Sequence, residues 1–140
     1  MFITGNVKNS VRREFSHENI EFTGFVSEDR LQELLCSCCF IILPIIIGSG
    51  TKLKLIEGMS MGIPIVASQH CFDGVPFTAE YGKPYLVSST AEEYLEHMNL
   101  LTVSTETRNS LSQAAVEFFY DTFVSPKNRK KWANVLGINY

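Results

Sequence analysis

Apolar and polar segments alternate along the first 90 residues in the way that alternating strands and helices require. The apolar runs are short and end at glycine, proline or polar clusters, which predicts strands at residues 2–4, 20–24, 40–43, 63–67 and 85–87. The segments between them predict helices at residues 9–16, 27–36 and 51–61. After residue 90 the pattern predicts helices alone, at residues 90–101, 106–123 and 126–136.

Several of these predicted helices have residues that are typical of helix ends. Ser27 is an expected N-cap, and the acidic residues that follow it suit the positive end of the helix dipole. Residues 90–93, Thr-Ala-Glu-Glu, have the form of a capping box. Gly62 is expected to end the helix at residues 51–61, and Pro126 suits a first helical turn.

The order of elements predicts an α/β fold with a parallel sheet flanked by helices on both faces. The run at residues 40–43 is apolar throughout, as in a strand that is covered on both sides. A length of 140 residues corresponds to one ordinary domain, in which residues 104–140 form C-terminal helices.

Composition narrows the classes of function. Hydrophobic residues make up 45% and charged residues 19% of the chain, which is typical of a globular protein. A net charge of −3 provides no basic field, so no nucleic-acid partner is expected. The longest apolar run, residues 40–47, is much shorter than the ~20 residues that span a bilayer. No signal peptide is expected ahead of the first strand, which favours the cytoplasm.

The cysteines and histidines do not predict a metal site. The segment "CSCC", residues 36–39, lacks the paired spacing of zinc ligands. We expect its cysteines to be small buried residues where a helix runs into a strand. His17, His70 and His97 lie far apart in the sequence, and we expect them on the surface or in loops.

The segment "GSGTKLKLIE", residues 48–57, is the main candidate for chemistry. In parallel α/β folds ligands lie outside the carboxyl ends of strands, where helix N-termini attract phosphate. Gly48 and Gly50 would let the backbone approach an anion closely. The residue order matches neither a P-loop nor a dinucleotide fingerprint. Pro44, where a receiver domain would need an aspartate, argues against that class.

The helix at residues 51–61 has two distinct sides. The arc expected to face the sheet consists of Leu53, Leu55, Ile56, Met59 and Ser60. Lys54 and Glu57 lie together on the other side, three residues apart. They are either an exposed ion pair or a lysine for phosphate beside a carboxylate for the two hydroxyls of a ribose.

A family resemblance favours the second alternative. The segment "IEFTGFVSEDRLQELLCSCCFIILPIIIGSGTKLKLIEGMSMGIPIVAS", residues 20–68, resembles the carboxyl-terminal domain of retaining GT-B glycosyltransferases of group 1. The shared features are Phe22-Thr23-Gly24, V-x-x-x-x-L-x-x-L from Val26, a strand ending in Pro44, the glycine loop, and L-I-E-G-M-x-x-G-x-P-I-V-A-S. The resemblance covers about residues 1–103 and implies a Rossmann-like domain that binds a nucleotide-sugar donor.

The resemblance also implies roles for single residues. The donor-binding residues it implies are Gly48, Ser49, Gly50, Thr51, Lys52, Lys54 and Glu57. Among these, Glu57 matches the second glutamate of the family's E-x₇-E motif, which binds the donor ribose. Ser49 stands where the first glutamate, which meets the donor sugar, would be. Phe25 and Val26 match the loop that contacts the base through its backbone.

The activity implied is transfer of a sugar from a UDP- or GDP-sugar with retention of anomeric configuration. No further cofactor and no obligatory metal are implied. The acceptor would be a glycan or a lipid-linked sugar in polysaccharide or glycoconjugate biosynthesis, in the cytoplasm or at the inner membrane face. The family's separate acceptor-binding domain has no counterpart in residues 1–140, so we expect an incomplete chain that is inactive alone.

Two alternatives follow from these departures. Ser49 fits a non-catalytic nucleotide-binding or scaffold domain that has kept the fold and lost the chemistry. Trp132 and Leu136 lie in a segment that in relatives packs on the amino-terminal domain. Without that domain they would be exposed apolar surface, which predicts self-association.

Overall fold

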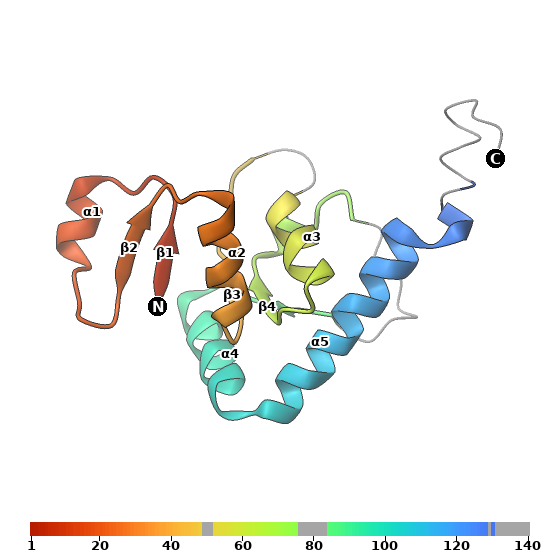
Figure 1. Cartoon of the computed structure of the whole chain (residues 1–140). Coiled ribbons are helices and arrows are strands. Elements are labelled where there is room, and N and C mark those ends of the chain that lie inside the picture. Colours follow the sequence, from red (N-terminus) through yellow and green to blue (C-terminus); the bar gives the residue numbers. More distant parts are fainter. Residues whose placement is uncertain (49–51, 76–83, 129, 131–140) are drawn as a thin grey trace. The chain divides into compact units, whose positions relative to one another are not determined.

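The computed structural model describes residues 1–48, 52–75, 84–128 and 130 (Figure 1). The chain divides into two compact units, Met1–Cys38 and Cys39–Tyr140, and each is described by itself. Both are α/β units whose strands pair in parallel and are accompanied by helices, so the predicted fold class is confirmed. The assignment of residues 1–140 to a single domain stays a prediction.

The first unit contains two parallel strands and two helices. Its elements are β1 (Phe2–Thr4), α1 (Asn9–Glu14), β2 (Glu21–Gly24) and α2 (Glu28–Ser37). The strands pair with Ile3 opposite Phe22. The Arg12 guanidinium donates to the Val7 carbonyl at 3.1 Å and lies 5.9 Å from the centre of the Phe22 ring. Ser27 caps α2 as predicted, because its hydroxyl accepts from the Arg30 N–H at 3.3 Å.

The second unit is built on a parallel sheet in the order β3-β4-β5. Its elements are β3 (Ile41–Leu43), α3 (Leu53–Ser60), β4 (Ile65–Ala67), the 3₁₀ helix η1 (Gln69–Phe72), β5 (Leu86–Val87), α4 (Ala91–Val103), α5 (Thr105–Phe119) and the π-helical turn η2 (Tyr120–Val124). Ile42 pairs with Val66, which pairs in turn with Leu86. Most of the predicted helix at residues 126–136, with Trp132 and Leu136, lies outside the described residues.

The central strand β4 is buried on both faces, as a strand flanked by helices must be. Ile65 and Ala67 belong to the larger core, which α3, η1 and α5 complete. Val66 points to the opposite side and packs with residues of α4 and α5, including Leu101 and Leu111. The alternation of side chains along β4 therefore holds the layers on its two sides together.

Helix α3 ends in the way that the sequence predicts. Ser60 is its last residue, Met61 is the C-cap, and Gly62 follows with φ of +65°. The N–H of Gly62 donates to the Met59 carbonyl and that of Ile63 to the Gly58 carbonyl, both at 3.0 Å, which is a Schellman motif. A Cβ at residue 62 would lie 3.0 Å from atoms of Ser112 and Val116, so α5 passes close to this turn.

The sheet-facing side of α3 was predicted only in part. Leu55 and Met59 are fully buried, but Leu53 is 79% exposed and Ser60 is exposed as well, so these two assignments were wrong. The helix begins at Leu53 rather than Thr51, and the Leu53 side chain is exposed to solvent rather than buried in the core. Gly58 occupies the contact instead, because a Cβ there would lie 2.5 Å from Ile41 Cδ1.

The cysteines near the end of α2 also depart from expectation. Cys36 and Cys39 are exposed and Cys38 is half-buried, so the expectation of small buried residues was wrong for this cluster. Cys71, in η1, is the buried cysteine. Within the described ranges, no helix is both long enough and apolar enough to cross a membrane.

The two leucines of α3 provide a matched test of the packing. We expect Leu55→Ala to lower the free energy of unfolding by about 2–5 kcal/mol, because it opens a cavity in a fully buried site. Leu53→Ala, on the same helix, should change it by no more than about 0.5 kcal/mol. Urea denaturation followed by circular dichroism measures both. Equal effects of the two substitutions would contradict the placement of α3.

Candidate functional site

The three parallel strands of the second unit direct their carboxyl ends to one edge of the sheet. Residues 44–48 follow β3, Ser68 and η1 follow β4, and Ser88 and Ser89 follow β5. Segments that are far apart in sequence therefore meet there, at the edge where ligands of parallel α/β folds bind.

A pocket of about 270 Å³ opens at this edge. It is lined by Pro44, Ile46, Ser68, Gln69, His70, Ser88, Ser89 and Tyr94. The lining combines three serine hydroxyls, an amide and an imidazole with a few apolar side chains. Groups of this kind can hydrogen-bond a polar ligand such as a sugar.

Gly48 and Lys52 lie close together beside this edge. Gly48 has φ of +126°, a conformation that residues with a Cβ rarely adopt. A Cβ built there would lie 3.5 Å from Lys52 Nζ, so the ammonium group is next to the glycine backbone. Lys52 is also the residue that immediately precedes α3. A positive side chain, from the residue at a helix N-terminus, thus lies beside Gly48, an arrangement suited to an anion.

The remaining predicted donor residues divide into two groups. Ser49, Gly50 and Thr51 lie outside the described residues. Lys54 and Glu57 are exposed on α3, and although the structure describes both side chains, no ion pair joins them. The alternative of a simple Lys–Glu ion pair is therefore not observed.

The predicted base loop belongs to the first unit. Phe25 is 85% exposed, and Val26 is half-buried between β2 and α2. Because the two units are described separately, the role of this loop stays a prediction.

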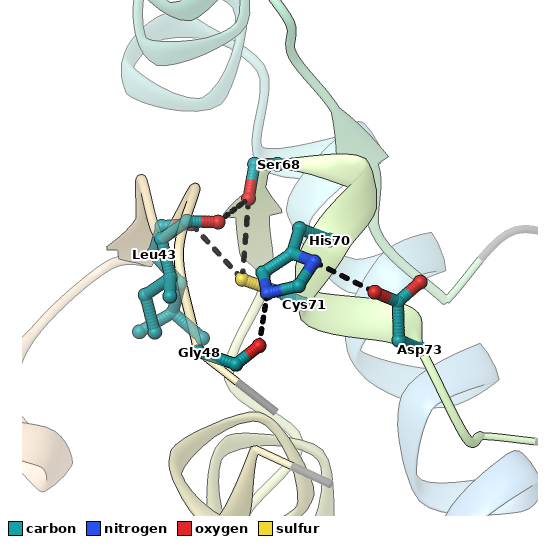
Figure 2. A network of polar contacts seen from close by, with 7 residues as sticks. Leu43, Gly48, Ser68, His70, Cys71 and Asp73 are labelled. Atoms are coloured by element: carbon teal, nitrogen blue, oxygen red, sulfur yellow. Dashed lines mark hydrogen bonds and ion pairs between the residues drawn. The ribbon is translucent and has the colours of Figure 1, made fainter. Parts of the chain in front are cut away.

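A network of polar contacts joins η1 to the segment after β3 (Figure 2). His70 Nδ1 lies 2.7 Å from Asp73 Oδ2, and His70 Nε2 contacts the Gly48 carbonyl oxygen. The Ser68 hydroxyl donates to the Ile45 carbonyl. The Cys71 thiol donates to the Leu43 carbonyl at 3.2 Å.

His70 is the contact that sequence reasoning missed. It was expected as an ordinary surface or loop histidine, but it lines the pocket and holds the first glycine of the candidate segment. The sequence contains one weak signal, an aspartate three residues after the histidine, but its other partner is a backbone carbonyl 22 residues away.

The far side of the pocket contains a second set of polar groups. Ser88 is fully buried, and its hydroxyl lies 2.8 Å from His97 Nδ1. The buried Tyr94 hydroxyl has no hydrogen-bond partner of ordinary length in the part of the chain that the structure describes. Burial raises the pKa of Tyr94; Cys71 acts in the same direction, and the Ser68 side chain acts against it.

Comparison with known families shows to which family the chain belongs. The family described as glycosyl transferases group 1 matches residues 1–119. The chain belongs to this family. No curated protein matches the chain.

Because the chain belongs to the glycosyl transferases group 1, the general reaction of the protein is the transfer of a sugar. Such a transferase moves a sugar from a donor to an acceptor, so the relevant ligands are sugar substrates. The carboxyl edge of the β3-β4-β5 sheet is the place where this chain collects a pocket, hydroxyl groups and a lysine beside a glycine turn. This edge is the candidate substrate site.

Two of the hydroxyl groups that line the pocket, those of Ser88 and Tyr94, should respond differently to removal. Ser88→Ala is expected to lower the free energy of unfolding by about 1–3 kcal/mol, because it leaves His97 Nδ1 without its partner. Tyr94→Phe should leave stability unchanged or higher at pH 7, because it removes a buried hydroxyl with no partner. Urea denaturation at pH 7 measures both.

The raised pKa of Tyr94 also predicts how the stability of the chain changes at alkaline pH. A raised pKa of Tyr94 means that its stabilising contribution is full at neutral pH and is lost as the pH rises beyond about 10. Tyr94→Phe should therefore lose less stability than the parent chain in this range. A Tyr94→Phe variant that is less stable than Ser88→Ala at pH 7 would contradict the assignment of partners.

Proposed function

We propose that this glycosyltransferase chain binds a nucleotide diphosphate sugar, a UDP- or GDP-sugar, as the donor for sugar transfer with retention of anomeric configuration. The observation that carries the proposal is the position of the Lys52 ammonium group beside Gly48, at the beginning of α3. The donor residues we propose are Gly48, Ser49, Gly50, Thr51, Lys52, Lys54 and Glu57.

The diphosphate is the part of the donor that this arrangement suits best. The glycine at residue 48 lets an anion approach the backbone, and Lys52 supplies a charge beside it. The N-terminus of α3 adds the positive end of a helix dipole. These groups would also stabilise the charge that develops on the diphosphate as the sugar leaves, which is how such a site accelerates transfer.

Glu57 is the proposed partner of the donor ribose. Its side chain is exposed on α3 and is not engaged by Lys54. A carboxylate accepts two hydrogen bonds at once, which suits the adjacent 2′- and 3′-hydroxyls. Phe25 and Val26 would contact the base. Neither a metal nor another cofactor takes part in this proposal.

The size of the pocket supports a contact with one part of the donor. Its volume of about 270 Å³ lies just under the usual range of ~300–1,000 Å³ for small-molecule sites. Its serines and His70 could bind the hydroxyl groups of a sugar. The acceptor we propose is a glycan or a lipid-linked sugar, with the reaction in the cytoplasm or at the inner membrane face.

An NMR titration with UDP, GDP and their sugars tests the donor site. We expect Glu57→Ala to weaken binding by about tenfold, the value of a lost hydrogen-bonded charge. Lys52→Gln should weaken it by a similar factor, because the diphosphate loses a charge-assisted contact. Glu117→Ala, which removes an exposed carboxylate on α5 outside the pocket, is the matched control and should bind as the parent does.

Two results of this titration would contradict the donor site. The first is the absence of any shift of the resonances of residues 48–57 with every nucleotide. The second is binding by Glu57→Ala and Lys52→Gln that is as tight as binding by the Glu117→Ala control.

The second candidate is a non-catalytic nucleotide-binding or scaffold domain. Ser49, at a position where the resemblance implies a sugar-binding glutamate, is the observation that favours it. This candidate shares the expected nucleotide binding but implies that no sugar is transferred even when an acceptor is held against the donor.

We further expect residues 1–140 alone to bind donor without transferring sugar. Positioning the acceptor supplies much of the rate of such a reaction, and the pocket is large enough for only part of one substrate. Release of UDP or GDP from nucleotide sugars, with a panel of simple glycan acceptors, is the measurement, and Glu57→Ala sets the background. Sustained release above that background would show that the 140 residues are already a working enzyme.

A further inference from the structure

His70 lies where β4 gives way to η1, with a side chain that is 31% exposed and lines the pocket. Its two ring nitrogens have different partners. Nδ1 is 2.7 Å from the Asp73 carboxylate, and Nε2 meets the carbonyl oxygen of Gly48 (Figure 2). The imidazole therefore bridges the end of η1 and the beginning of the proposed donor segment.

Both partners of His70 are hydrogen-bond acceptors. An ionised carboxylate and a backbone carbonyl have no proton to donate, so each ring nitrogen must donate its own. A neutral imidazole has one N–H and would turn a lone pair toward one of the two oxygens. Both contacts are therefore hydrogen bonds at the same time only in the imidazolium form, which carries a positive charge.

The contact with Gly48 bears on how the site receives an anion. A carbonyl oxygen directed at a diphosphate would repel it, and His70 takes up the oxygen of Gly48. The imidazolium further adds to the positive charge of Lys52, whose Nζ lies near the same glycine.

We propose that His70, oriented by Asp73, is a positioning residue of the donor site that holds the Gly48 carbonyl and supplies positive charge beside the diphosphate. This inference rests on the proposed donor site. It adds a group that neither the glycine segment nor Glu57 contains, and it makes donor affinity depend on pH.

The charged and titratable groups around His70 determine how far a change of its charge can alter donor binding. Among the described residues, Asp73 is the anion in contact with it and Lys52 is the cation near its partner Gly48. Cys71 and Tyr94 lie in the same surroundings, and burial raises the pKa of Tyr94. Below pH 8.5, His70 is therefore the group here whose change of charge should alter donor binding.

The test uses UDP-glucose and GDP-mannose, because a diphosphate esterified at both ends keeps a constant charge between pH 5.5 and 8.5. We expect the parent chain to bind its preferred donor about tenfold more tightly at the acid end, as the gain of one charge-assisted contact implies. His70→Gln should bind about tenfold more weakly than the parent at pH 6 and equally at pH 8.5. Asp73→Asn, which keeps an acceptor but removes its charge, should lose about threefold at pH 6.

His17→Gln is the matched control, because it removes a histidine in the first unit and should keep the parent's pH profile. A second measurement uses the parent chain alone. In ¹⁵N spectra of the histidine rings, both nitrogens of His70 should be protonated at pH 6, and the Gly48 carbonyl resonance should move as the proton is lost. A single protonated nitrogen at pH 6 would overturn the inference.

The outcomes separate this inference from the proposed function. If the parent binds a nucleotide sugar and His70→Gln binds it equally well with the same pH profile, the role of His70 is wrong and the donor site stands. If neither nucleotide sugar shifts any resonance of the parent, the donor site fails and the inference fails with it.

Discussion

The burial of β4 on both faces is the constraint on which the second unit depends. Ile65 and Ala67 enter one core and Val66 enters the other, so a strand of three residues holds helices on its two sides. Since β3 and β5 pair with it in parallel, the segments that leave all three strands come out at one edge. The site follows from this arrangement, because hydroxyl groups, a glycine turn and a histidine gather only when those segments meet.

Positive charge is concentrated where this edge meets α3. Lys52 and the N-terminus of the helix contribute it directly, and His70 lies beside them, between Asp73 and the Gly48 carbonyl oxygen. The opposite side of the pocket is lined by the neutral side chains of Ser88, Ser89 and Tyr94. This polarity matches a donor that has an anionic diphosphate at one end and a neutral sugar at the other.

Features set by neighbouring residues were predictable from the sequence. The capping box at Thr90 and the Schellman motif at Gly62 are encoded within a few positions, and both are present. Features that depend on packing between distant segments could not be predicted from the sequence. The arc of α3 could be drawn from helical geometry, but not the fact that Leu53, in its first turn, is exposed to solvent. His70 was missed because a bond to a backbone carbonyl leaves no residue pattern, and the fold alone brings Gly48 within reach. The glycine segment was chosen from its own residue types, and its role in donor binding stays a prediction.

Three side chains of one short turn bind three carbonyl groups of the segment that leaves β3. Ser68, His70 and Cys71 take the oxygens of Ile45, Gly48 and Leu43 (Figure 2). The path of that segment therefore depends partly on residues at the beginning of η1. Substitutions at residues 68–71 would therefore be expected to shift the backbone of the segment that ends at Gly48. Donor preference could be altered in this way without changing the sequence of the glycine segment itself.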